Sequence, residues 1–254
     1  MGLADSLVAQ LLQCQVSFWH LQARLQADTD AEALHDLRIE LRRLRSLLRP
    51  LRKHAAIAQL ETLAAELSRR TTALRDLEVL TKYLQQQGLN QAAEVRQLTL
   101  QAGYGLLRDD RQLVALLALL DSTPATIRNL AQQGALGGKK PIKRYLHKQC
   151  RQLVCALDDP TYDGHRLRLL VKRVRYANEM HRRQSSLSMS TMRVLKELQA
   201  ALGDWHDLYQ WCQLASNQAD LQPLQVSWLR KAKQAFDAAK GPLHKLAKQL
   251  RKQH

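Results

Sequence analysis

Apolar residues recur every three or four positions through most of the 254-residue chain, which is the period of an α-helix. Between 34 and 48, for example, leucines stand at positions 34, 37, 41, 44 and 48, with mostly polar residues between them. Applied along the chain, this pattern predicts eight helices. Their expected bounds are about 3–27, 31–53, 56–87, 90–120, 142–157, 163–183, 188–218 and 222–251.

The main interruption of this pattern is QQGALGGKKP, where three glycines and a proline separate two helical halves. We expect a linker at 132–140 between repeats at 1–131 and 141–254, each with four helices. Helix breakers are otherwise scarce, and strand-forming aromatic residues make up only 5% of the chain. The predicted class is all-α. Shorter breaks are expected at 28–30, near Pro50, at 87–90, at DDPTYDG, at SSLSMS and near Pro223.

The two halves resemble each other in sequence. At an offset of 130, a charged set in the second predicted helix falls on a set of the same charge in the sixth. These are His35, Arg38, Arg42, Arg43 and Arg45 on His165, Arg168, Lys172, Arg173 and Arg175. At an offset of 131, Asp76 and Leu77 fall on Asp207 and Leu208. A tandem duplication therefore predicts two four-helix bundles related by pseudo-two-fold symmetry, with the repeated faces lining a shared groove.

The charge balance predicts a polyanionic partner, because 39 Lys and Arg against 23 Asp and Glu give a net charge of +16. The four cysteines show neither a C-x-x-C pair nor metal-ligand spacing, so reduced thiols and no metal or cofactor are expected. The longest apolar run, at 113–120, is far shorter than the roughly 20 residues that span a bilayer. We therefore expect a cytoplasmic protein that does not insert into membranes.

The positive charge is arranged as a stripe on each repeated helix. Since each helical residue advances about 100°, the stripe spans an arc of about 80° beside the leucine stripe. Its members in the first copy are His35, Arg38, Arg42, Arg45 and Arg49. Those in the second are His165, Arg168, Lys172 and Arg175, with Tyr176 near the same face. Arg43 and Arg173 point elsewhere, and we expect them to line a second wall or to pair with an acid.

Arginine donors match phosphate oxygens, and histidine adds a donor whose charge can change near neutral pH. Such a stripe extends about 15 Å, which suits a ligand with repeated negative charge. On the third helix of each copy, Asp76 and Asp207 are expected to orient a basic side chain, while Arg75 and His206 add donors. Arg144 is a further candidate on the fifth helix, where basic residues recur at spacings of four, three and four.

The motif H-x-x-R-x-x-x-[RK]-R-x-R occurs twice, in HDLRIELRRLR and HRLRLLVKRVR, and each copy is followed by a third helix, with LRDLEVL or LGDWHDL. The chain thereby resembles the CHAD domain family over essentially its whole length. The resemblance implies two four-helix bundles around a basic central groove or pore, and binding of inorganic polyphosphate. The ligand contacts it implies are His35, Arg38, Arg42, Arg43, Arg45, His165, Arg168, Lys172, Arg173 and Arg175. Two departures, Thr71-Thr72 in place of Leu202-Gly203 and Glu78 in place of an aspartate, concern the packing of the third helix.

Three functions compete. The first is a non-catalytic polyphosphate-binding module that targets or organises polyphosphate granules. The second is a nucleic-acid-binding protein that uses the same charge, although the sequence has no helix-turn-helix, zinc-finger or RNA-binding signature. The third is a metal phosphohydrolase suggested by the single dipeptide His206-Asp207, which would need further ligands to converge. The sequence favours the first, without catalysis, and leaves the oligomeric state open.

Overall fold

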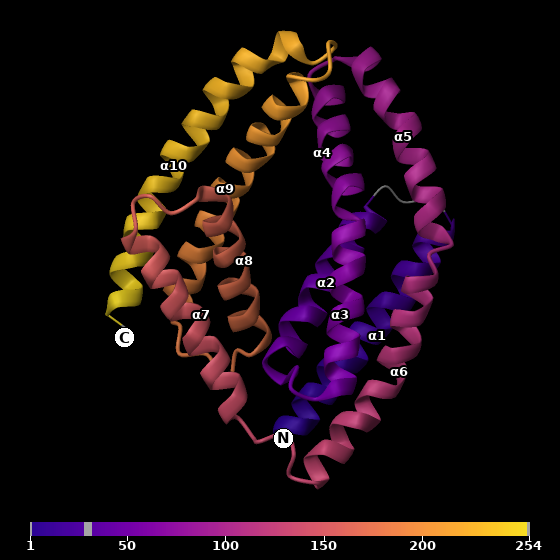
Figure 1. The fold of residues 1–254 in the computed structure, drawn as a ribbon, viewed down its shortest axis with the longest axis vertical. Coiled ribbons are helices and arrows are strands. Elements are labelled where there is room, and N and C mark those ends of the chain that lie inside the picture. The colour runs from indigo at the N-terminus through magenta and orange to yellow at the C-terminus, as the bar shows by residue number, and fades with distance from the viewer. Residues whose placement is uncertain (1, 28–31, 253–254) are drawn as a thin grey trace. The chain divides into compact units, whose positions relative to one another are not determined.

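The computed structural model describes residues 2–27 and 32–252, and every regular element in these two ranges is a helix (Figure 1). The predicted all-α class is therefore confirmed. The chain divides into two compact units, Met1–Ile142 and Lys143–His254, a boundary that falls just after the expected linker. The predicted break at 28–30 and the first residue of the predicted helix 31–53 lie outside the described residues.

Unit 1 contains six α-helices within its described residues. They are α1 (Leu3–Ala27), α2 (Ala33–Leu48), α3 (Ala55–Arg70), α4 (Thr72–Gln86), α5 (Asn90–Arg108) and α6 (Arg111–Gln132), and a short 3₁₀ turn, η1 (Arg49–Leu51), follows α2. Unit 2 contains α7, which begins at the boundary (Lys140–Asp158), α8 (Gly164–Met180), α9 (Met189–Ala215) and α10 (Gln225–Arg251), with η2 (Gln222–Leu224) before the last helix.

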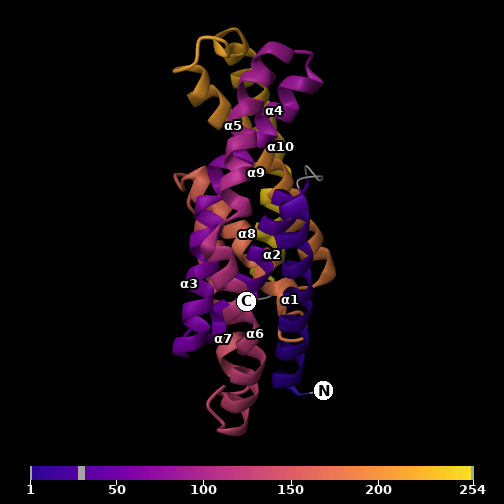
Figure 2. The ribbon, with the colours of Figure 1, turned by 90° about the vertical axis from the view of Figure 1, so that its right-hand side faces the viewer.

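In unit 1, four helices enclose a core. Helix α1 contacts α2 and α6, and α3 contacts the same two helices, so the four form a closed ring. Leucines 34, 37, 41 and 44 of α2 are completely buried in this core, as the leucine stripe predicts. Helices α4 and α5 pair with each other and extend from this ring as a hairpin (Figures 1 and 2).

In unit 2, the four helices share a second core. Cys150, Leu153 and Ala156 of α7 are buried with apolar residues of α8 and α9, and with Leu246 and Leu250 of α10. Helices α9 and α10 run side by side along much of their length. The order of elements repeats that of unit 1 if the broken pairs α3–α4 and α5–α6 each correspond to one long helix.

The continuous helices predicted at 56–87 and 90–120 are wrong in detail. The first breaks at Thr71, because the hydroxyls of Thr71 and Thr72 donate to the carbonyls of Leu67 and Ser68 and compete with regular helical bonding. The second breaks at Asp110, whose carboxylate accepts the backbone N–H of Gln112 at 2.7 Å and so starts a new helix.

The predicted end of this helix at residue 120 is also wrong, since α6 continues to Gln132 with Pro124 inside it. The proline removes one backbone hydrogen bond, but Leu120, Pro124 and Ile127 are all buried, and this packing offsets the loss. Within the described residues, α6 is the one helix long and apolar enough, by length and composition, to cross a membrane. Here its apolar side packs against α1 and α3, as expected for a core helix.

Candidate anion-binding site

The basic stripe of unit 2 begins at the first turn of α8, and two local features fix that turn. Asp163 caps the helix, accepting the backbone N–H of Arg166 at 2.8 Å. Gly164 lets the ring of Trp205 approach closely, because a Cβ at this position would lie 2.9 Å from that ring. As a result α8 packs tightly on α9, and the rings of His165 and His206 lie 4.8 Å apart, centroid to centroid.

His206 lies in a positively charged environment. Its pKa is lowered from 6.5 to about 4, mainly by burial and in addition by the nearby charges of Arg168, His165 and Lys172. The only acid of the predicted set in this unit is Asp207, whose Oδ1 lies 3.8 Å from Nη2 of Arg168. We call His165, Arg168, Lys172 and His206 the α8–α9 cluster.

The low pKa of His206 makes the stability of the protein pH-dependent. Between pH 6.5 and about 4 the unfolded chain binds a proton that folded His206 does not, so acidification in this window favours unfolding. We expect His206→Gln to reduce the fall in melting temperature between about pH 7 and about pH 4.5. Exposed His244→Gln is the matched control and should behave as the parent. An unchanged pH dependence in His206→Gln would contradict this assignment.

Farther along α8, Arg175 of the stripe contacts two residues of the same helix. Nε of Arg175 donates to Glu179 at 2.8 Å, and its guanidinium carbon lies 4.8 Å from the centroid of the Tyr176 ring. This distance permits a cation–π contact. Arg175 and Tyr176 are therefore held together on α8, as their positions in the sequence suggest.

In unit 1, arginines of the stripe on α2 form hydrogen bonds and ion pairs with residues outside that helix. Arg38 Nη1 donates to the Ser68 carbonyl and the Thr71 hydroxyl, both at 2.8 Å, and so closes the break between α3 and α4. Arg45 and Arg49 each place Nε 3.2 Å from the same oxygen of Glu61 on α3. Arg42, which lies between Arg38 and Arg45 in the sequence of α2, is half-buried.

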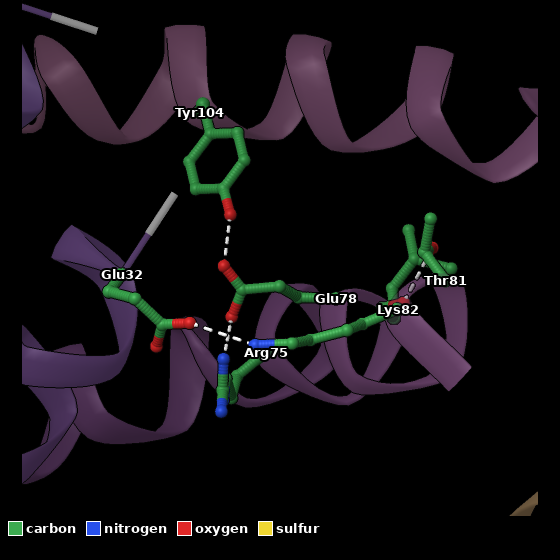
Figure 3. A network of polar contacts seen from close by, with 7 residues as sticks. Glu32, Arg75, Glu78, Thr81, Lys82 and Tyr104 are labelled. Carbon is green, nitrogen blue, oxygen red and sulfur yellow. Dashed lines mark hydrogen bonds and ion pairs between the residues drawn. The ribbon is translucent and has the colours of Figure 1, made fainter. Parts of the chain in front are cut away.

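Arg75 belongs to a network of polar contacts at the base of the α4–α5 hairpin (Figure 3). Arg75 donates to Glu78, which also accepts the hydroxyl of Tyr104 from α5. Burial and the hydrogen bond to Glu78 raise the pKa of Tyr104, so the phenol stays protonated. Burial, followed by the charge of Arg75, lowers the pKa of His35.

The acids that engage this stripe were not predicted as site residues. Glu61 reaches Arg45 and Arg49 from α3, and this contact depends on how α2 and α3 pack, so no spacing within α2 could identify it. Asp76, a predicted orienting residue, lies half-buried on α4. On the same helix, Arg75 pairs with Glu78 three residues later. Lys82 and Glu32 add an ion pair of 3.1 Å to the same region (Figure 3).

The two arginines that point away from the stripes have different surroundings. Arg43 donates to Glu40 at 2.6 Å, which corresponds to pairing with an acid. Arg173 instead lines a pocket together with Arg144 of α7. Among residues 2–27 and 32–252, no three His, Cys, Asp or Glu side chains gather in a way that could hold a metal ion.

The family model of the CHAD domain matches residues 9–216 of the chain. The crystal structure of the CHAD domain from the plant Ricinus communis is similar, with a TM-score of 0.63 and 24% sequence identity. The match covers 96% of this chain and 92% of that chain. No curated protein matches the chain.

Proposed function

The chain belongs to the CHAD domain family, and from this premise we propose that it is a non-catalytic module that binds inorganic polyphosphate. The observation that carries the proposal is the α8–α9 cluster. The rings of His165 and His206 lie 4.8 Å apart, and the charges of Arg168 and Lys172 add to burial in lowering the pKa of His206, which indicates a local excess of positive charge. A phosphate chain lying along α8 would neutralise this charge and accept hydrogen bonds from Arg168 and Lys172.

The two stripes differ in how much charge they offer to a ligand. In unit 1, Arg38 closes a helix break, and Arg45 and Arg49 share Glu61. In unit 2, His165 is exposed, and the ion pair of Arg168 with half-exposed Asp207 is long. Long, partly exposed ion pairs are weak. We propose that unit 2 contributes more of the binding free energy than unit 1.

The proposal extends to the cellular context in two respects. A polyphosphate-binding module without catalysis is suited to a cytoplasmic role in targeting or organising polyphosphate granules. The two-fold arrangement of the repeats around a basic groove, which the duplication suggests, is part of the same proposal, and inorganic polyphosphate is its expected partner.

Binding of labelled long-chain polyphosphate over a range of salt concentrations tests the function. We expect the logarithm of the association constant to fall steeply and linearly with the logarithm of salt concentration, because phosphate contacts release counterions. We expect duplex DNA at equal phosphate concentration to fail to displace the label. The polyphosphate should keep its chain length after prolonged incubation.

Three results would contradict the proposal. Efficient displacement by duplex DNA would favour a nucleic-acid-binding protein that uses the same basic surface. Shortening of the polyphosphate would show an enzyme, and a binding constant that is independent of salt would exclude a charged track as the contact surface.

A further inference from the structure

A second basic feature lies within unit 2, on another side of α8. A pocket of about 950 Å³ lies between α7 and α8. Arg144, Lys148 and Arg151 line it from α7, at spacings that place them on one face of that helix. Arg166 and Arg173 line it from α8. The pocket therefore has a row of cations on each of its two helices.

This α7–α8 pocket is separate from the α8–α9 cluster. Around the axis of α8, the direction of Arg166 and Arg173 differs by roughly 120° from the mean direction of His165, Arg168 and Lys172. None of the latter three residues lines the pocket. A ligand in the pocket and a chain along the stripe would thus contact different faces of one helix.

The charge of the pocket is largely uncompensated. In the described part of the chain, none of its five Lys and Arg side chains makes an ion pair with a carboxylate. Its one acid, Asp159, accepts the backbone N–H and the hydroxyl of Thr161 at 2.8 and 2.7 Å. These hydrogen bonds lower the pKa of Asp159, which stays ionised and turned to its own loop. One carboxylate against five cations leaves a site for an anion.

The duplicated face of unit 1 provides an internal comparison. Asp36 and Glu40 of α2 correspond, at the offset of 130, to Arg166 and Leu170 of α8. In unit 1 these acids neutralise cations, since Asp36 pairs with Arg24 at 2.8 Å and Glu40 with Arg43 at 2.6 Å. In unit 2 both acids are missing from the equivalent face, so the positive charge there is specific to the second copy.

The pocket also has an apolar wall. Leu169 is 44% exposed and lines the pocket together with Leu170, Ala156 and the ring of Tyr162. An inorganic phosphate chain has no apolar surface to cover these groups. A ligand that carries both phosphates and a flat organic ring would use both parts, and the volume lies within the range of about 300–1,000 Å³ typical of small-molecule sites.

We propose that the α7–α8 pocket binds a nucleoside polyphosphate. The phosphates contact the arginines of the two cationic rows, where planar guanidinium groups can donate two hydrogen bonds each. The base lies against Leu169 and the Tyr162 ring, which provide apolar contact and stacking. This inference does not depend on polyphosphate binding by the α8–α9 cluster, and it goes beyond that function.

Calorimetric titration of the full chain with ATP tests the proposal. We expect saturable binding of one ATP per chain, and binding of inorganic tripolyphosphate that is weaker by about tenfold because it leaves the apolar wall uncovered. Arg166→Asp, which restores the acid of unit 1 at an exposed position, should weaken ATP binding by at least about tenfold. Arg230→Asp, an equal charge change at an exposed position on α10, is the matched control and should leave ATP binding unchanged.

A second variant tests the apolar wall. Leu169→Asn at this exposed position should lower the affinity for ATP and leave that for tripolyphosphate unchanged. Three results would overturn the proposal: no saturable ATP binding up to about 1 mM, equal affinity for ATP and tripolyphosphate, or equal effects of Arg166→Asp and Arg230→Asp. Titration of the same variants with long-chain polyphosphate separates a failure of the nucleotide proposal from a failure of the proposed function. Leu169→Asn should bind long-chain polyphosphate as the parent does.

Discussion

Replacing His165, Arg168 and Lys172 together by alanine is expected to lower the affinity for long-chain polyphosphate by about a hundredfold, because charge-assisted hydrogen bonds to phosphate are lost. The salt dependence should weaken as well. With two permanent charges removed, the slope of the logarithmic salt plot should fall by between about one and two. Fluorescence anisotropy with labelled polyphosphate at several salt concentrations measures both quantities.

The matched control removes the same types of side chain from another surface. His244, Arg230 and Lys233 are all exposed on α10, and they supply one histidine, one arginine and one lysine. Their triple alanine variant should change the affinity only slightly, because the net charge alone makes a small contribution at physiological salt. If both triple variants lose affinity equally, the polymer is held by overall charge, and the α8–α9 cluster is not the site.

Arg38→Ala is expected to lower the free energy of unfolding by about 2 kcal/mol, which is in the range for losing hydrogen bonds from a charged donor. Its guanidinium donates to the Ser68 carbonyl and to the hydroxyls of Thr71 and Thr72, so its removal opens the junction between α3 and α4. The affinity for polyphosphate should change little by comparison. Urea denaturation followed by circular dichroism measures the stability.

The equivalent residue of unit 2, Arg168, provides the comparison. Arg168→Ala should cost less stability than Arg38→Ala, because its ion pair with Asp207 is 3.8 Å long and partly exposed. Arg168→Ala should lower the affinity for polyphosphate more than Arg38→Ala does. The opposite ranking in either measurement would show that the duplicated arginines keep the same role in both units.

The different expectations for Arg38 and Arg168 come from their contacts with other helices. The two motifs carry the same pattern of His, Arg and Lys residues along the chain, and they predict equal ligand contacts for Arg38 and Arg168. The difference arises from the third helix, which breaks at Thr71 in unit 1 and continues through Gly203 in unit 2. The Thr71-Thr72 departure was visible in the sequence. That an arginine of α2 would fill the break depends on the packing of α2 against α3, which no pattern within one helix contains.

Some helix ends follow from local sequence, whereas others depend on tertiary packing. Gly88, with φ of 72°, ends the α4 region where the QGLN signal predicts it, because few other residues adopt that conformation easily. Pro124 is also a breaker by local rules, yet α6 passes through it. Burial of Leu120 and Ile127 on either side of the proline decides that case, since tertiary packing can exceed a local preference.

The sequence by itself determined the all-α class, the buried apolar stripe of each helix that carries the motif, and the family. These follow from residue spacing along single helices, and such spacing is a local property of the chain. The tertiary structure alone decided which cations are engaged by acids of other helices, as Arg49 is by Glu61, and which surround a pocket, as Arg166 does. Electrostatic compensation depends on distances between helices, so it becomes visible only once the helices have packed.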